Sequence, residues 1–69
     1  MSLSIDELPP VLTVPEAAKV LRISRSAAFR QAELFRLTGG REGIPNYQLG
    51  RVLRVPRDQL LRRFGLADA

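Results

Sequence analysis

Two helix-start signals close together set the strongest limit on how this chain folds. Thr13 is followed three residues later by Glu16, the pairing of a capping box, and Pro15 is tolerated in a first helical turn. The apolar residues that follow recur at helical spacing and form one stripe: Val14, Ala17, Ala18 and Leu21. We therefore expect a helix over Val14–Leu21.

The second signal is Ser24, which follows a short turn at Arg22-Ile23 and predicts a helix from Arg25 to about Leu37. Gly39-Gly40 would end this helix. On a helical wheel its residues separate into two arcs. The apolar arc holds Ala27, Ala28, Ala32, Leu34 and Phe35, and the polar arc holds Arg25, Ser26, Arg30, Glu33 and Arg36, with Phe29 in its middle. Two short helices joined by so short a turn predict a helix-turn-helix.

Residues 39–46 contain three Gly and one Pro and predict a flexible loop. Alternating residues at Tyr47–Leu49 and 53–55 then predict a β-hairpin. A three-residue connection over residues 50–52 places the apolar side chains on one face, whereas a two-residue turn divides them. We expect the longer connection, with Arg51 at its tip and Gln48 and Arg54 on the polar face. The expected apolar face holds Tyr47, Leu49, Leu53 and Val55.

A short third helix is expected after the hairpin. Pro56 suits its first position and Asp58 suits its positive N-terminal end. Its apolar stripe consists of Leu60, Leu61 and Phe64. Gly65 and Leu66 fit a Schellman stop, in which Leu66 folds back on Leu61. We divide the chain into a flexible acidic arm (1–10), one domain (11–66) and a frayed tail (67–69).

The basic residues are concentrated in one part of the chain. All eleven Lys and Arg lie between Lys19 and Arg63, against three acids there, which gives that segment a formal charge of +8. Ten of the eleven bases are Arg, whose guanidinium suits phosphates and guanine edges. So basic a small domain predicts a polyanion partner, most often nucleic acid. An ordinary helical hairpin with solvated Arg remains the plain alternative.

The residues give little support to an enzymatic function or a membrane function. The chain has no Cys and no His, which excludes disulfides, the usual zinc-finger ligands and Cys or His nucleophilic chemistry. Ser24 and Ser26 have no His to activate them, and residues 39–43 lack the spacing of a phosphate-binding loop. No apolar run approaches the roughly 18 residues of a membrane span, and residues 1–10 do not resemble a signal peptide. We expect no catalysis, cofactor, metal, membrane or small-molecule substrate, and a cytoplasmic, nucleoid-associated protein.

Two segments also carry a family likeness. Residues 12–30 read LTVPEAAKVLRISRSAAFR, and residues 44–64 read IPNYQLGRVLRVPRDQLLRRF. Together they resemble the small MerR-like, excisionase-type DNA-binding proteins over about forty of the 69 residues. The chain departs from the family pattern at Arg22, where Gly is usual, and at Phe29, where Tyr is common. Residues 34–43 form a stretch several residues longer than usual.

The resemblance implies a winged helix-turn-helix, a mainly α fold with a small β-hairpin as its wing. It implies that the second helix faces the major groove with Ser24, Arg25, Ser26, Phe29 and Arg30. It implies that the wing reaches the DNA backbone or minor groove with Arg51 and Arg54. Lys19 and Arg22 flank the turn between the helices and are candidates for phosphate contact.

The function implied is that of an excisionase, which binds and bends double-stranded DNA as an accessory factor of an integrase. A small transcriptional regulator of the same fold is the first alternative, and a protein-interaction module using its basic face is the second. Arg25, Ser26 and Arg30 are the three side chains offered to base edges, and at about 1–3 kcal/mol each they discriminate too weakly to select one genomic site. We therefore expect a free monomer and cooperative self-association on DNA, through the arm and the Leu66 tail.

Overall fold

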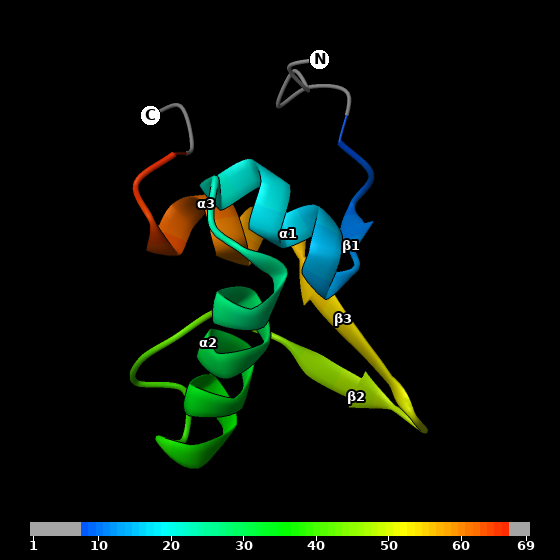
Figure 1. Ribbon diagram of the computed structural model, residues 1–69, viewed down its shortest axis with the longest axis vertical. Helices are drawn as coiled ribbons and strands as arrows, with labels where there is room; N and C mark the ends of the chain where they lie inside the picture. Colours follow the sequence, from blue (N-terminus) through cyan, green and yellow to red (C-terminus); the bar gives the residue numbers. More distant parts are fainter. Residues whose placement is uncertain (1–7, 67–69) are drawn as a thin grey trace.

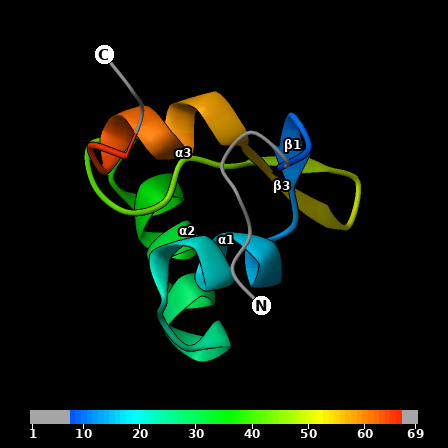
Figure 2. The ribbon, with the colours of Figure 1, turned by 90° about the horizontal axis from the view of Figure 1, so that it is seen from above.

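The computed structural model describes residues 8–66, which form three helices and a three-stranded antiparallel sheet (Figure 1). The elements in chain order are β1 (Val11–Leu12), α1 (Val14–Leu21), α2 (Arg25–Leu37), β2 (Tyr47–Leu49), β3 (Val52–Pro56) and α3 (Arg57–Arg63). The strand order is β1-β3-β2. Seen from above, the β2–β3 hairpin projects away from the helices (Figure 2).

The two predicted helix starts are confirmed. Thr13 Oγ1 accepts a hydrogen bond from the Glu16 N–H at 3.2 Å, and Glu16 Oε1 accepts one from the Thr13 N–H at 2.8 Å. This is the capping box, and it satisfies two backbone donors that the first turn of α1 leaves without helical partners. Ser24 Oγ accepts from the Ala27 N–H at 3.1 Å and begins α2 in the same manner.

Helices α2 and α3 both end at a glycine. The Leu66 N–H donates to the Leu61 carbonyl at 2.7 Å, and Gly65 has a φ of +69°, so the predicted Schellman motif closes α3. Helix α2 ends in the same way at Gly39, whose φ is +65°, and Gly40. Left-handed backbone is open to glycine without steric penalty, which is why these two positions stop their helices.

Helix α1 ends with the same pattern but without a glycine. The Ile23 N–H donates to the Ala18 carbonyl at 3.0 Å, and Arg22 takes the left-handed position with φ +58° and ψ +44°. Among the described residues, Arg22 is the only non-glycine with a positive φ. The Cβ of Arg22 therefore sits in a conformation that costs an L-residue about 1–2 kcal/mol.

The prediction for the hairpin turn is wrong. Strand β2 pairs with β3 in the register Tyr47↔Arg54, Gln48↔Leu53 and Leu49↔Val52, so the turn has the two residues Gly50 and Arg51. Cross-strand partners share a face of the sheet, so one face holds Tyr47, Leu49, Val52 and Arg54. The other face holds Gln48, Leu53 and Val55. Gln48 and Arg54 therefore lie on opposite faces, not on one polar face.

The reason lies in which apolar side chains reach the core. Val55 is fully buried and Leu53 packs against the core, and these two alone define the inner face of the hairpin. Tyr47, Leu49 and Val52 stay 39%, 62% and 42% exposed. The expected turn was wrong because Tyr47 and Leu49 do not share the core-facing side of the hairpin with Leu53 and Val55.

A third strand, β1, was not predicted. Val11 pairs with Pro56 and Leu12 with Val55, so the segment before α1 lies against the far end of the hairpin. Arg57 fastens the same segment, donating from its backbone N–H to the Pro10 carbonyl at 2.9 Å and from Nη1 to the Leu8 carbonyl at 2.8 Å.

The expectation of a flexible arm does not hold for residues 8–10. Leu8 is only 5% exposed and belongs to the core cluster, so residues 8–10 are part of the packed domain. The rest of the expected arm, residues 1–7, and the expected frayed tail, residues 67–69, lie outside the described residues.

Small residues let α1 and α2 pack closely. Ala17 and Ala18 of α1 and Ala28 and Ala32 of α2 are at most 4% exposed. Larger side chains fill the remaining core: Leu8, Leu12, Val14, Ile44, Val55 and Leu60. The predicted apolar arc of α2 is buried at Ala28 and Ala32 and half-buried at Ala27, Leu34 and Phe35. Phe64, expected in the stripe of α3, is 41% exposed.

The α2–β2 connection, residues 38–46, has no regular structure, yet it is fixed to α2. The Ile44 N–H donates to the Gln31 carbonyl at 3.0 Å, and Ile44 is fully buried. The buried Asn46 amide donates to the carbonyls of Ala32 and Ile44, both at 2.8 Å. Gly43 passes so near α2 that a Cβ there would lie 2.2 Å from the Gln31 carbonyl oxygen. The expected flexible loop is thus anchored along its second half.

Candidate nucleic-acid interface

None of the eleven basic side chains is buried. Two of them hold distant segments together: Arg57 bonds to the Leu8 carbonyl, and Arg63 bonds to the Gly40 carbonyl. A third, Arg54, donates to the neighbouring Leu53 carbonyl at 3.1 Å. Within residues 8–66, the other basic side chains make no hydrogen bond or ion pair with protein groups. Most of the positive charge is therefore free to meet a ligand.

The predicted reader residues all lie on the exposed surface of α2 and its start. Arg25, Ser26 and Arg30 are exposed. Ser24 is exposed too; its Oγ already accepts the capping hydrogen bond, which leaves the hydroxyl hydrogen and one lone pair for a ligand. Phe29 is 44% exposed although it is a large aromatic residue.

Phe29 forms one wall of a groove that separates α2 from the hairpin. This α2–hairpin groove has a volume of about 310 Å³ and is lined by Thr13, Val14, Pro15, Phe29, Arg51, Val52, Leu53 and Arg54. It brings the aromatic ring of α2 together with both basic residues predicted for the hairpin. Arg25, Ser26 and Arg30 do not line the groove and face solvent elsewhere on α2.

The hairpin tip presents Arg51 to solvent. Gly50 has a φ of +62°, which suits the first central position of a tight two-residue turn. Gln48 Nε2 donates to the Gly50 carbonyl at 2.8 Å and secures the turn from the side. Arg54 lies nearer the base of the hairpin and is partly buried. Arg51 and Arg54 therefore line the groove from different positions along the hairpin.

Lys19 and Arg22, the candidates for phosphate contact near the helix turn, are both exposed. Neither lines the α2–hairpin groove. Val52 and Pro15 do line it, and sequence reasoning did not single them out. The register was the missing signal, because a two-residue turn puts Val52 and Arg54 on one face.

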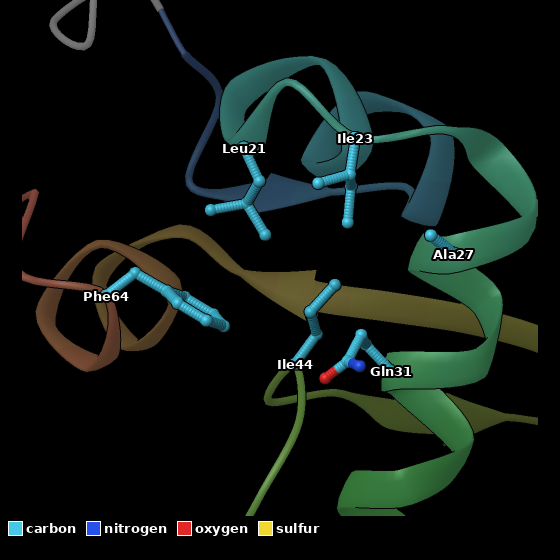
Figure 3. Close-up of a pocket in the computed structure, with 6 residues that line it drawn as sticks. All are labelled: Leu21, Ile23, Ala27, Gln31, Ile44 and Phe64. Carbon is cyan, nitrogen blue, oxygen red and sulfur yellow. The ribbon is translucent and has the colours of Figure 1, made fainter.

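A second depression, the apolar hollow, lies on the other side of α2. Its volume is about 300 Å³, and its lining consists of Leu21, Ile23, Ala27, Gln31, Ile44 and Phe64 (Figure 3). Side chains from α1, α2 and the end of α3 point into it from three directions. Gln31 brings the only polar side chain, so this hollow lacks the charges that a polyanion needs.

Among the described residues, no three His, Cys, Asp or Glu side chains are grouped as a metal site would require. The helices found over residues 8–66 are all too short or too polar to span a bilayer.

In comparison with known proteins, the chain matches no protein-family model, no curated protein and no solved structure.

Proposed function

We propose that this chain is a winged helix-turn-helix protein that binds double-stranded DNA. In this proposal α1 and α2 form the helix-turn-helix, the β2–β3 hairpin is the wing, and α3 closes the domain. The order of the elements supports it, as does the +8 charge of residues 19–63. The observation that carries it is the α2–hairpin groove, where Phe29 faces Arg51 and Arg54 beside the exposed surface of α2.

The proposed binding mode follows from dimensions and charge. An α-helix with its side chains is about 10–12 Å across and enters a major groove about 12 Å wide. Arg25, Ser26 and Arg30 then reach base edges from the exposed side of α2. Arg51 and Arg54 grip the backbone beside the groove, which gives affinity and register but little sequence information. Phe29 packs its ring on a sugar or a thymine methyl group.

We further propose an accessory role in site-specific recombination, as an excisionase that bends DNA for a partner integrase. This rests on the family resemblance of residues 12–30 and 44–64. In this proposal the chain has no catalytic activity of its own. A small transcriptional regulator would use the same contacts, and a recombination assay with the cognate integrase separates the two roles. Excision that does not depend on the protein favours the regulator.

The binding proposal is tested by the salt dependence of affinity for duplex DNA. With about five Arg meeting phosphates, log K falls against log[salt] with a slope of about −4 to −5, from about 0.9 per contact. A slope flatter than about −2 contradicts DNA binding as the main function. It would favour the alternative of a protein-interaction module that uses its basic surface for an acidic partner.

A further inference from the structure

Helix α2 presents different side chains on its opposite sides. Figure 1 shows the α2–β2 connection running along one side of α2 and the hairpin extending on the other. Ser26 belongs to the proposed reader surface. Phe35 follows it by nine residues, which is about two and a half helical turns, so the two side chains point in opposite directions. A site built around Phe35 therefore lies away from the surface proposed to meet DNA.

Such a site is present as a basic depression, which we call the α3 hollow. Its volume is about 260 Å³, and it is lined by Phe35, Pro45, Gln59, Arg62 and Arg63. The last three residues follow the i, i+3, i+4 spacing that places side chains on one face of a helix. The hollow therefore lies where α2, α3 and the α2–β2 connection meet.

No acidic side chain lines the α3 hollow. Asp58, the acid nearest in sequence on α3, is paired with Arg57 at 3.2 Å. Glu42, on the connection, is exposed outside the hollow. The two guanidinium groups of the hollow are therefore not neutralised by the residues that surround them.

One of these two guanidinium groups is already held in place. Arg63 Nη1 donates to the Gly40 carbonyl at 3.0 Å, and its Cζ lies 5.5 Å from the centroid of the Phe35 ring. A guanidinium has five N–H donors, so Arg63 keeps donors for a ligand after this bond. Arg62 is exposed and, within residues 8–66, its side chain bonds to no protein group. The hollow thus has one fixed and one free cation.

The rest of the lining is apolar and rigid. Phe35 is half-buried and Pro45 is buried. Pro45 stands between Ile44 and Asn46, and both of these residues bond to backbone carbonyls of α2. A site built between fixed segments loses little conformational entropy when it binds. The hollow therefore combines two cations and one amide with a fixed apolar wall.

We propose that the α3 hollow binds an acidic segment of a partner protein. The planar fork of Arg62 matches a carboxylate and can donate two parallel hydrogen bonds to it. The remaining donors of Arg63 and the Gln59 amide serve a second carbonyl or carboxylate oxygen of the segment. The methylene groups of a glutamate pack against Phe35 and Pro45. A phosphate has no such apolar stem, so the apolar wall favours a glutamate-bearing peptide over nucleic acid.

The consequence is a protein with two binding surfaces that work at the same time. The α3 hollow and the proposed reader surface share no residue, and Phe35 and Ser26 point in opposite directions. At about 0.15 M salt, charges are screened beyond about 8 Å, so DNA bound on the reader surface does not expel the acidic segment by repulsion. The acidic-segment site does not depend on the proposed DNA binding, whereas the joining of DNA to a second protein does.

The variant that tests the site is Arg62→Gln, with a labelled short poly-glutamate peptide as the probe and fluorescence anisotropy as the readout. Charge-assisted hydrogen bonds contribute enough that Arg62→Gln should weaken peptide binding about tenfold. Arg41→Gln is the matched control, because Arg41 is exposed on the connection outside the hollow and loses the same charge. It should weaken binding less than about twofold, as expected of a screened surface charge. Thermal unfolding of both variants shows whether the fold is intact.

Equal losses for Arg62→Gln and Arg41→Gln would mean general attraction to a basic protein and would overturn the site. So would equal binding of a poly-glutamine peptide. Unlabelled duplex DNA is then added to the peptide complex at about 0.15 M salt. We expect the peptide to stay bound, and its release in step with DNA binding would show that the hollow takes nucleic acid instead. If the chain does not bind duplex DNA, the proposed function falls, and the comparison of the two variants still decides the acidic-segment site.

Discussion

Replacing Gly43 with alanine should destabilise the protein more than any other glycine substitution in the described fold. A Cβ at Gly43 would lie 2.2 Å from the Gln31 carbonyl oxygen and 2.8 Å from the Phe35 backbone nitrogen. Both atoms belong to the backbone of α2 and cannot move aside as a side chain would. The connection would have to lift off the helix and carry the buried Ile44 with it.

The expected loss is about 3–5 kcal/mol. Gly43 has a φ of +90°, and positive φ alone costs an L-residue about 1–2 kcal/mol. Breaking the hydrogen bond from the Ile44 N–H removes about 1 kcal/mol more. Partial exposure of the Ile44 side chain accounts for the rest, because full burial of Ile is worth about 1.5–3 kcal/mol. The free energy of unfolding of a domain of this size is about 3–10 kcal/mol in total. The Gly43→Ala variant should therefore be only marginally stable.

Gly39→Ala is the matched control. Gly39 also has a positive φ, +65°, but no heavy atom lies within 4 Å of where its Cβ would be. This variant should lose only about 1 kcal/mol, or about 4–8 °C in Tm, by circular dichroism. Urea unfolding then gives both free energies on one scale. Equal losses for Gly39→Ala and Gly43→Ala would refute the close approach of the connection to α2.

Three further outcomes are expected. Arg22→Gly should raise the free energy of unfolding by about 0.5–1 kcal/mol, since glycine adopts the left-handed φ of +58° without strain. A lower free energy of unfolding in urea would contradict the cap geometry. Arg30→Ala should lose about 1–3 kcal/mol of binding free energy on the target site and less on random DNA. Arg51→Ala should weaken binding to both DNAs by the same factor in parallel titrations. A free monomer that loads cooperatively should bind two or three neighbouring sites more tightly per site than one by gel shift, and equal affinity per site would refute cooperation.

The features that the sequence predicted are those set by neighbours along the chain. Thr13 and Glu16 are three residues apart, and the stop at Gly65 depends on the single turn before it, so both can be recognised from a short window of sequence. The bounds of α1 and α2 were predicted correctly for the same reason. The basic residues of the candidate site came instead from the family resemblance of residues 12–30 and 44–64, and their role stays a prediction.

What the sequence did not predict depends on contacts between distant segments. Strand β1 forms because Leu12 pairs with Val55 of β3. A segment of two residues is too short for a sequence pattern to predict a strand. The groove between Phe29 and the hairpin depends on the two-residue turn, which parity of hydrophobic residues argued against. The anchoring of the connection depends on the close approach of Gly43 to α2. The Gly and Pro content of residues 39–46 predicted a flexible loop instead.

The central claim is that the surface formed by α2 and the hairpin binds duplex DNA. Amide chemical shifts of the isotope-labelled chain, followed by NMR during titration with a duplex at low salt, test it most directly. The account predicts the largest shifts at residues 25–30 and at Gly50 and Arg51, with Val11 of β1 unaffected. Shifts concentrated instead around the apolar hollow, at Ile44 and Phe64, would contradict it.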